Sequence, residues 1–202
     1  MKIFIILIIY IALPTDSFCM RYVLHCDSLL LKASLDTALM QAGTCEKSGR
    51  NDGDVERYVI SVGGMPGQPY CAAGQYYCFL AAAKALSLPL VCIPIMKTSS
   101  SQDMFRDAKT RGRKSDSPAG KHDLVFWRKM NKPGGHVERV LSAGYAGWLI
   151  TVGFNTSVRP AGGSISIEGV FIKRRNILHP VVKMTLLGII GFEFKHGGDN
   201  GF

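Results

Sequence analysis

The chain has 202 residues, of which 47% are hydrophobic and 19% are charged, and its formal net charge is +9. This length and hydrophobic content fit one ordinary domain with its own core, and the lack of a repeat or long low-complexity tract excludes a repeat protein. The excess of positive charge indicates an anionic partner.

The N-terminus has the pattern of a secretory signal. A lysine is followed by an apolar run over residues 3–13 and a polar break over residues 14–17. This run is too short to cross a bilayer, which takes roughly 20 apolar residues. We expect a signal peptide over residues 1–18 and a protein that is secreted, periplasmic or in the cell envelope. Lipidation at Cys19, which follows a bulky residue, and an uncleaved anchor are the weaker alternatives.

Helices are predicted first along the chain and strands afterwards. Apolar spacing predicts helices over residues 28–42, 54–62 and 69–86, and the segment 98–117 is predicted to be irregular with a helical turn at 102–109. After residue 122 the pattern changes to strands separated by turn residues, at 123–128, 136–143, 148–153 and 169–173. This order predicts an α+β domain.

The predicted domain spans residues 27–179. Beyond it, residues 181–194 are mostly apolar, and a tail rich in glycine and asparagine follows. We expect residues 180–202 to form an extension that adds a strand or short helix to the sheet, and a membrane-binding hairpin is the alternative.

Cys71 carries the clearest chemical signal. It stands at the start of the third predicted helix, in the run Gln68-Pro69-Tyr70-Cys71-Ala72-Ala73. The first turn of a helix has unpaired N–H groups and the positive end of the helix dipole, and both favour the nucleophilic thiolate. The small residues that follow leave room for a carbonyl group to reach the same N–H groups. A small buried apolar residue is the alternative interpretation.

A histidine and an asparagine complete a candidate triad with Cys71. His136 follows two glycines at the start of a predicted strand, and Asn155 follows the next strand. Neighbouring antiparallel strands would bring these two side chains within reach of each other. The thiol needs an imidazole to take its proton, and the imidazole needs a third group to orient it. The order cysteine, histidine, polar residue is that of a papain-like triad.

Several blocks, in the same order, resemble the CHAP-type amidohydrolases and peptidases, especially the bacterial and phage branch that degrades peptidoglycan. The resemblance extends from about residue 35 to residue 175, and its blocks are Glu46 with 49–53, 55–58, 67–73, 123–126, 135–137, 155–157 and 169–175. It implies a papain-like fold with N-terminal helices packed on an antiparallel β-sheet. It also implies a nucleophile at Cys71, a general base at His136 and cleavage of an amide bond in a cell-wall peptide.

The chain departs from the family pattern at three positions. Gly74 stands where a bulky residue is usual, and His122 stands where a glycine is usual. Gly153 stands where a glutamate commonly precedes the asparagine, so a carboxylate that would orient the histidine is missing there. Asn155 can accept a hydrogen bond but cannot offset the imidazolium charge. A wall-binding module without catalysis is therefore the second functional hypothesis, and a cysteine peptidase acting on proteins is the third.

Other residues are candidates for the site. Gln68 and Tyr70 precede the nucleophile, and Trp127 lies on the strand before His136. We expect these three residues to contact substrate, and for the two aromatic side chains core packing is an equal alternative. His122 is a weaker alternative for the base, while Glu138 and Arg139 alternate along the histidine strand and receive no role.

Basic residues form clusters at 109–114, 128–132 and 173–175. Peptidoglycan stem peptides carry carboxylates and many envelopes contain anionic polymers, so a basic face would concentrate the protein at a cell wall. Aromatic residues seldom alternate with the basic ones and no reading motif occurs, so nucleic acid is not an expected partner. For any one cluster, solvated loops and strand edges are the alternative.

Cysteine spacing excludes one disulfide and leaves another open. Cys71 and Cys78 lie on one predicted helix, which separates their Cα atoms by about 10 Å, beyond the roughly 7 Å that a disulfide tolerates. Cys26 and Cys45 have no such restriction. An odd number of cysteines after the signal suits a free nucleophilic thiol. Neither a zinc site nor another cofactor is expected, because no paired Cys or His spacing is present.

Overall fold

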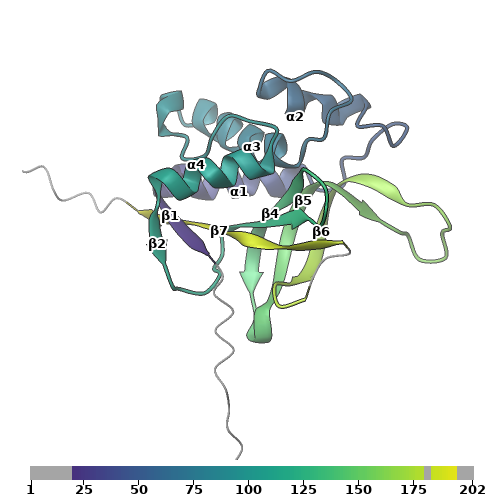
Figure 1. Ribbon diagram of the computed structural model, residues 1–202. Helices are drawn as coiled ribbons and strands as arrows, with labels where there is room; N and C mark the ends of the chain where they lie inside the picture. Colours follow the sequence, from purple (N-terminus) through teal and green to yellow (C-terminus); the bar gives the residue numbers. More distant parts are fainter. Residues whose placement is uncertain (1–19, 180–182, 195–202) are drawn as a thin grey trace, which may run out of the picture.

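The computed structural model describes residues 20–179 and 183–194, so the predicted signal peptide lies outside the described residues. Within them, helices cover one side of a seven-stranded sheet, which confirms the predicted α+β class (Figure 1). The helices are α1 (Ser28–Met40), α2 (Glu56–Ser61), α3 (Cys71–Ala85) and α4 (Ser101–Arg111). The strands are β1 (Arg21–Cys26), β2 (Arg113–Ser115), β3 (Leu124–Lys129), β4 (Gly135–Ala143), β5 (Trp148–Val158), β6 (Ile167–Asn176) and β7 (Met184–Phe194).

The sheet has the strand order β2-β1-β7-β3-β4-β5-β6, and β3 to β6 form an antiparallel meander. One part of the prediction is corrected, because β1 pairs with β7 in parallel and the sheet is therefore mixed. The segment predicted as an extension after residue 179 supplies β7, which lies between β1 and β3. This strand belongs to the middle of the sheet, so the domain does not end at residue 179.

Helix α1 shows how local sequence starts an element. The carboxylate of Asp27 accepts a hydrogen bond from the Leu30 amide at 2.8 Å, which satisfies one of the N–H groups left free at a helix start. Ser100 caps α4 in the same way, with its hydroxyl 3.2 Å from the Asp103 amide. Helix α4 is longer than the single turn predicted for this segment, and the short strand β2 follows it.

Gly74 lets α3 approach the sheet closely. A Cβ atom at this position would lie 2.2 Å from the ring of Phe154 on β5, so no larger residue fits without movement of that ring. The aromatic side chain of Phe154 thus fills the space that a side chain at residue 74 would occupy. Phe154 is fully buried and also packs edge to face on Tyr58, which places α2 against the same strand.

Candidate active site

Cys71 is the first residue of α3, as the sequence predicts. The residue before it, Tyr70, makes no side-chain capping bond, so no capping side chain occupies the first amides of the helix. The thiol is nearly buried, with 5% of Cys71 exposed. His136 and the backbone N–H groups of Val137 and Ala72 lie around the sulfur and lower the pKa of Cys71 against the effect of burial. The start of α3 and the start of β4 thus lie next to each other at the Cys71 sulfur.

His136 lies at the start of β4, directly after the glycine turn, and it is 8% exposed. Its Nε2 atom is 3.0 Å from Oε1 of Glu138. The imidazole is therefore held between the Cys71 sulfur on one side and a carboxylate on the other.

Glu138 is fully buried, and its carboxylate contacts three other side chains. Besides His136 it accepts a hydrogen bond from the Thr151 hydroxyl at 2.5 Å. The Arg175 guanidinium donates to both carboxylate oxygens, with Nε at 3.0 and 3.1 Å. A buried carboxylate is costly unless its charge is paired and its oxygens are bonded, and here both conditions hold.

The position of Glu138 explains the glycine at residue 153. The two residues are directly paired across β4 and β5, and a Cβ atom at Gly153 would lie 2.8 Å from the Glu138 carboxylate. A carboxylate from the adjacent strand thus occupies the space beside Gly153. The expectation that this group is missing is corrected.

These contacts shift the ionisation of all three residues. Burial opposes each charge, yet the hydrogen bonds from His136 and Arg175 lower the pKa of Glu138 to about 2. Burial likewise opposes a charged imidazole, but its bonds to Cys71 and Glu138 raise the pKa of His136 to about 9. Burial alone would raise the pKa of Cys71, but the hydrogen bond and charge of His136 outweigh it and lower that pKa. The favoured state is a thiolate beside an imidazolium.

We expect this thiolate at neutral pH, where an ordinary cysteine is protonated. The ion pair exists between the lowered pKa of Cys71 and the pKa of about 9 of His136, so acid removes it by protonating the sulfur and alkali by deprotonating the imidazolium. The ultraviolet absorbance of the thiolate, taken as the difference between parent and Cys71→Ala, measures it. A His136→Ala variant should lose most of this absorbance at neutral pH, and an unchanged signal would contradict the pairing.

Asn155 does not orient the histidine, and this predicted role is corrected. Its amide nitrogen lies 2.7 Å from Oδ1 of Asn51 and 3.3 Å from Oε1 of Glu46. The reason is an irregularity in the β5–β6 pairing between Gly153 and Thr156, where Asn155 adopts a left-handed φ of 52°. Asn155 therefore helps to hold the segment around Glu46, and Glu138 takes the position beside the imidazole.

The predicted substrate contacts lie in different surroundings. Tyr70 and Trp127 are each 1% exposed, so both pack in the interior and neither presents a ring to a ligand. The Tyr70 hydroxyl donates to Glu46 at 2.9 Å, and the Trp127 ring lies 6.2 Å from that of His136. Gln68 is half-buried and closes a turn by accepting from the Met65 amide at 3.1 Å. Substrate contact by Gln68 stays a prediction.

His122 adopts a left-handed φ of 77°, which explains why a glycine suits this position. Burial and the nearby positive charge of Arg139 lower the pKa of His122 to about 4. Arg139 is itself fully buried; it donates to the Ser34 hydroxyl at 3.2 Å and lies 4.7 Å from the Phe79 ring centre. Arg139 belongs to the packing under the helices, on the strand face opposite to His136 and Glu138.

The described cysteines are all free, so the possible pair Cys26 and Cys45 is not bridged. Across the part of the chain that the structure describes, no group of three or more His, Cys, Asp or Glu is placed to hold a metal ion. No helix among residues 20–179 and 183–194 combines the length and apolar character that a membrane span requires.

Neither a family model, nor a curated protein, nor a solved structure matches this chain. The site therefore has to be interpreted from its own geometry. The sequence patterns predict roles for Cys71 and His136 but for none of Glu138, Thr151 and Arg175, which the structure places beside them. One signal was available, because Glu138 follows His136 by two residues on a strand, and side chains two apart point to the same face.

Proposed function

We propose that the protein is an exported, papain-like cysteine amidohydrolase that cleaves an amide bond of the peptidoglycan stem peptide. The observation that carries this proposal is the chain of contacts from the Cys71 sulfur through His136 to the buried Glu138, built at the start of a helix. The wall substrate rests on the resemblance to CHAP-type enzymes and on the net charge of +9, which suits an acidic substrate.

The geometry supports a two-step reaction. The Cys71 thiolate attacks the amide carbonyl, and N–H groups near the start of α3 stabilise the oxyanion. His136 then gives its proton to the leaving amine as the carbon–nitrogen bond breaks, which leaves an acyl group on the sulfur. Neutral His136 next takes a proton from water, and the resulting hydroxide attacks the thioester. The acid is released and the thiolate–imidazolium pair is restored. Glu138 keeps the imidazole oriented and offsets its charge in both steps.

The alternative hypothesis, a wall-binding module without catalysis, rested on the glycine at residue 153, which leaves no carboxylate at that position. The carboxylate of Glu138 fills that place, so this reason for preferring the module no longer holds. A peptidase acting on proteins has no specific observation in its favour. Both alternatives are outcomes of the same test.

The test is digestion of isolated peptidoglycan sacculi, with the released fragments identified by mass spectrometry. The parent protein should release fragments and Cys71→Ala should release none, while Cys92→Ala, which removes an exposed thiol, should behave as the parent. Fragment masses identify the bond, either the muramoyl–alanine amide or a peptide link. Saturable binding by both parent and Cys71→Ala without release would favour the module. Digestion of denatured protein with intact sacculi would favour the peptidase.

A further inference from the structure

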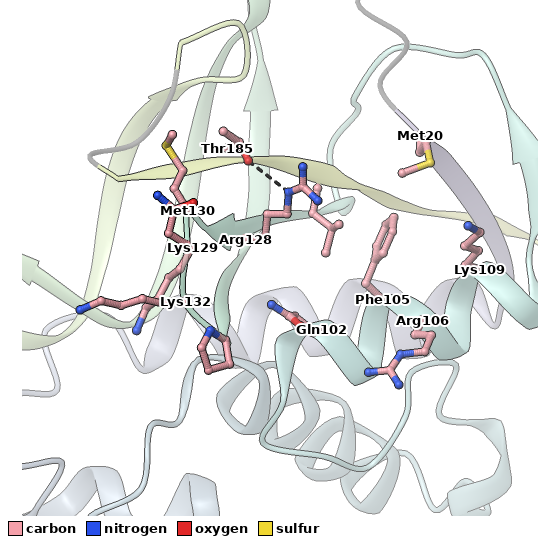
Figure 2. Close-up of a pocket in the computed structure, with 13 residues that line it drawn as sticks. Met20, Gln102, Phe105, Arg106, Lys109, Arg128, Lys129, Met130, Lys132 and Thr185 are labelled. Atoms are coloured by element: carbon pink, nitrogen blue, oxygen red, sulfur yellow. Dashed lines mark hydrogen bonds between the residues drawn. The ribbon is translucent and has the colours of Figure 1, made fainter.

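A cavity of about 760 Å³ lies between α4, the end of β3 with the loop that follows it, and β7. Figure 2 shows the Arg128 guanidinium in this space, between Thr185 on one side and Gln102 and Phe105 of α4 on the other. Its cationic lining residues are Arg106, Lys109, Arg128, Lys129 and Lys132. The fold therefore joins two basic clusters that are separate in the sequence, one from α4 and one from the end of β3 and the loop that follows it.

The positive charge of this cavity is largely uncompensated. Arg106 is paired with Asp103 at 2.5 Å, and Arg128 donates to the Thr185 hydroxyl at 3.4 Å. Among the described residues no ion-pair partner occurs for the three lysines, and none of those that line the cavity is Asp or Glu. Like charges around one hollow repel each other, and an anionic ligand with more than one charge relieves this repulsion.

The cavity is coupled to the catalytic histidine through the glycine turn. The side-chain amide of Gln102 donates to the Gly134 carbonyl at 2.7 Å, and Gly134 precedes His136 by two residues. Arg128 is paired directly with Gly135 across β3 and β4. At about 3.3 Å per strand residue, the turn lies about 7 Å from His136 along the backbone. The cavity and His136 are thus connected by one short stretch of backbone.

From this arrangement we infer that the cavity binds carboxylates of the amide substrate close to the bond that is cut. This inference rests on the proposed function and adds the substrate class, a peptide that carries several acidic groups near the scissile amide. Stem peptides have this chemistry, because free carboxylates recur within a few residues of their amides. Phe105 and Leu187 give the cavity apolar walls, which suit the methylene groups of such a peptide. A phosphate polymer bound on its own would need neither these walls nor the backbone connection to His136.

The test measures peptide binding to the full chain carrying Cys71→Ala, so that no turnover occurs. The probes are one synthetic stem peptide with free side-chain carboxylates and the same peptide with those groups amidated. Lys129→Gln with Lys132→Gln removes two charges from the cavity. Lys32→Gln with Lys84→Gln removes two exposed charges from α1 and α3 and is the matched control.

The free-carboxylate peptide should bind about tenfold more weakly to the cavity variant and equally well to the control. The affinity for the amidated peptide should be the same in the cavity variant and in the control variant as in the unsubstituted cavity. Equal weakening of both peptides, equal effects of both double variants, or no binding of either peptide would overturn the inference. The inference would also be overturned if the two cavity lysines affected the binding of a phosphate polymer but not the binding of the peptide. Because binding is measured without turnover, failure of the sacculus digestion would refute the hydrolase proposal separately.

Discussion

Glu138→Gln should lower kcat/KM for the amide substrate on the order of 10⁴-fold, the loss in kcat found when the carboxylate of a serine-protease triad becomes an amide. The glutamine can accept one hydrogen bond, but it cannot offset the imidazolium charge or the charge of Arg175. The pKa of His136 should then fall from about 9 toward its ordinary value, so the alkaline limb of the pH profile moves to lower pH. A kcat/KM profile across pH measures both effects.

Asn155→Gly is the matched control for this variant. Glycine accepts the left-handed backbone at this position, so the change removes the side chain without strain. We expect less than about a tenfold loss of kcat/KM, because Asn155 contacts Glu46 and Asn51 and has no bond to the imidazole. A larger loss from Asn155→Gly than from Glu138→Gln would restore Asn155 as the orienting residue.

Arg175→Met should lower the free energy of unfolding at neutral pH by about 3–5 kcal/mol, the usual cost of leaving one half of a buried ion pair. The reason is that Glu138 is fully buried and Arg175 donates to both of its oxygens. Denaturant titration measures this loss. Arg174→Met is the control; its guanidinium lies 4.1 Å from the Trp148 ring centre, a contact of about 1 kcal/mol.

The loss of stability in Arg175→Met should depend on pH. The pKa of Glu138 is about 2 in the folded protein and 4.5 as its ordinary value, so its ionised form stabilises the fold above pH 4.5. This contribution is lost as the pH falls toward 2. The stability difference between parent and Arg175→Met should therefore be largest above pH 4.5 and shrink in acid. A difference that does not change with pH would show that Arg175 stabilises the fold by packing alone.

The elements with strong local signals were predictable from the sequence. Helices α1 and α3 have apolar spacing over several turns, and the meander β3 to β6 is punctuated by turn residues, so their positions agree with expectation. Strands β1 and β2 were not predicted, and β7 was expected only as a strand or short helix added to the sheet, without its place between β1 and β3. The pairing of β1 with β7 joins residues near the two ends of the chain, such as Arg21 with Ile189, and no local pattern encodes such a partner.

The candidate site divides in the same way. Cys71 is marked by a helix start and His136 by a glycine turn before a strand, and both features are local. The identity of the carboxylate beside His136 depends on how β4 and β5 pair, because the pairing decides which strand places a side chain there. Glu138 and Gly153 are opposite each other, so a carboxylate on either strand would fill the same space. The irregularity after Gly153, which turns Asn155 away, is also a property of strand pairing.

The most direct measurement is the mass of the protein during turnover. Parent protein mixed with a stem-peptide substrate and quenched in acid should carry an acyl group, and peptide mapping should place it on Cys71. The Glu138→Gln variant should form this adduct more slowly, and Cys71→Ala should not form it. Substrate cleavage by Cys71→Ala at the parental rate, with no adduct on the parent, would contradict a mechanism based on this thiolate.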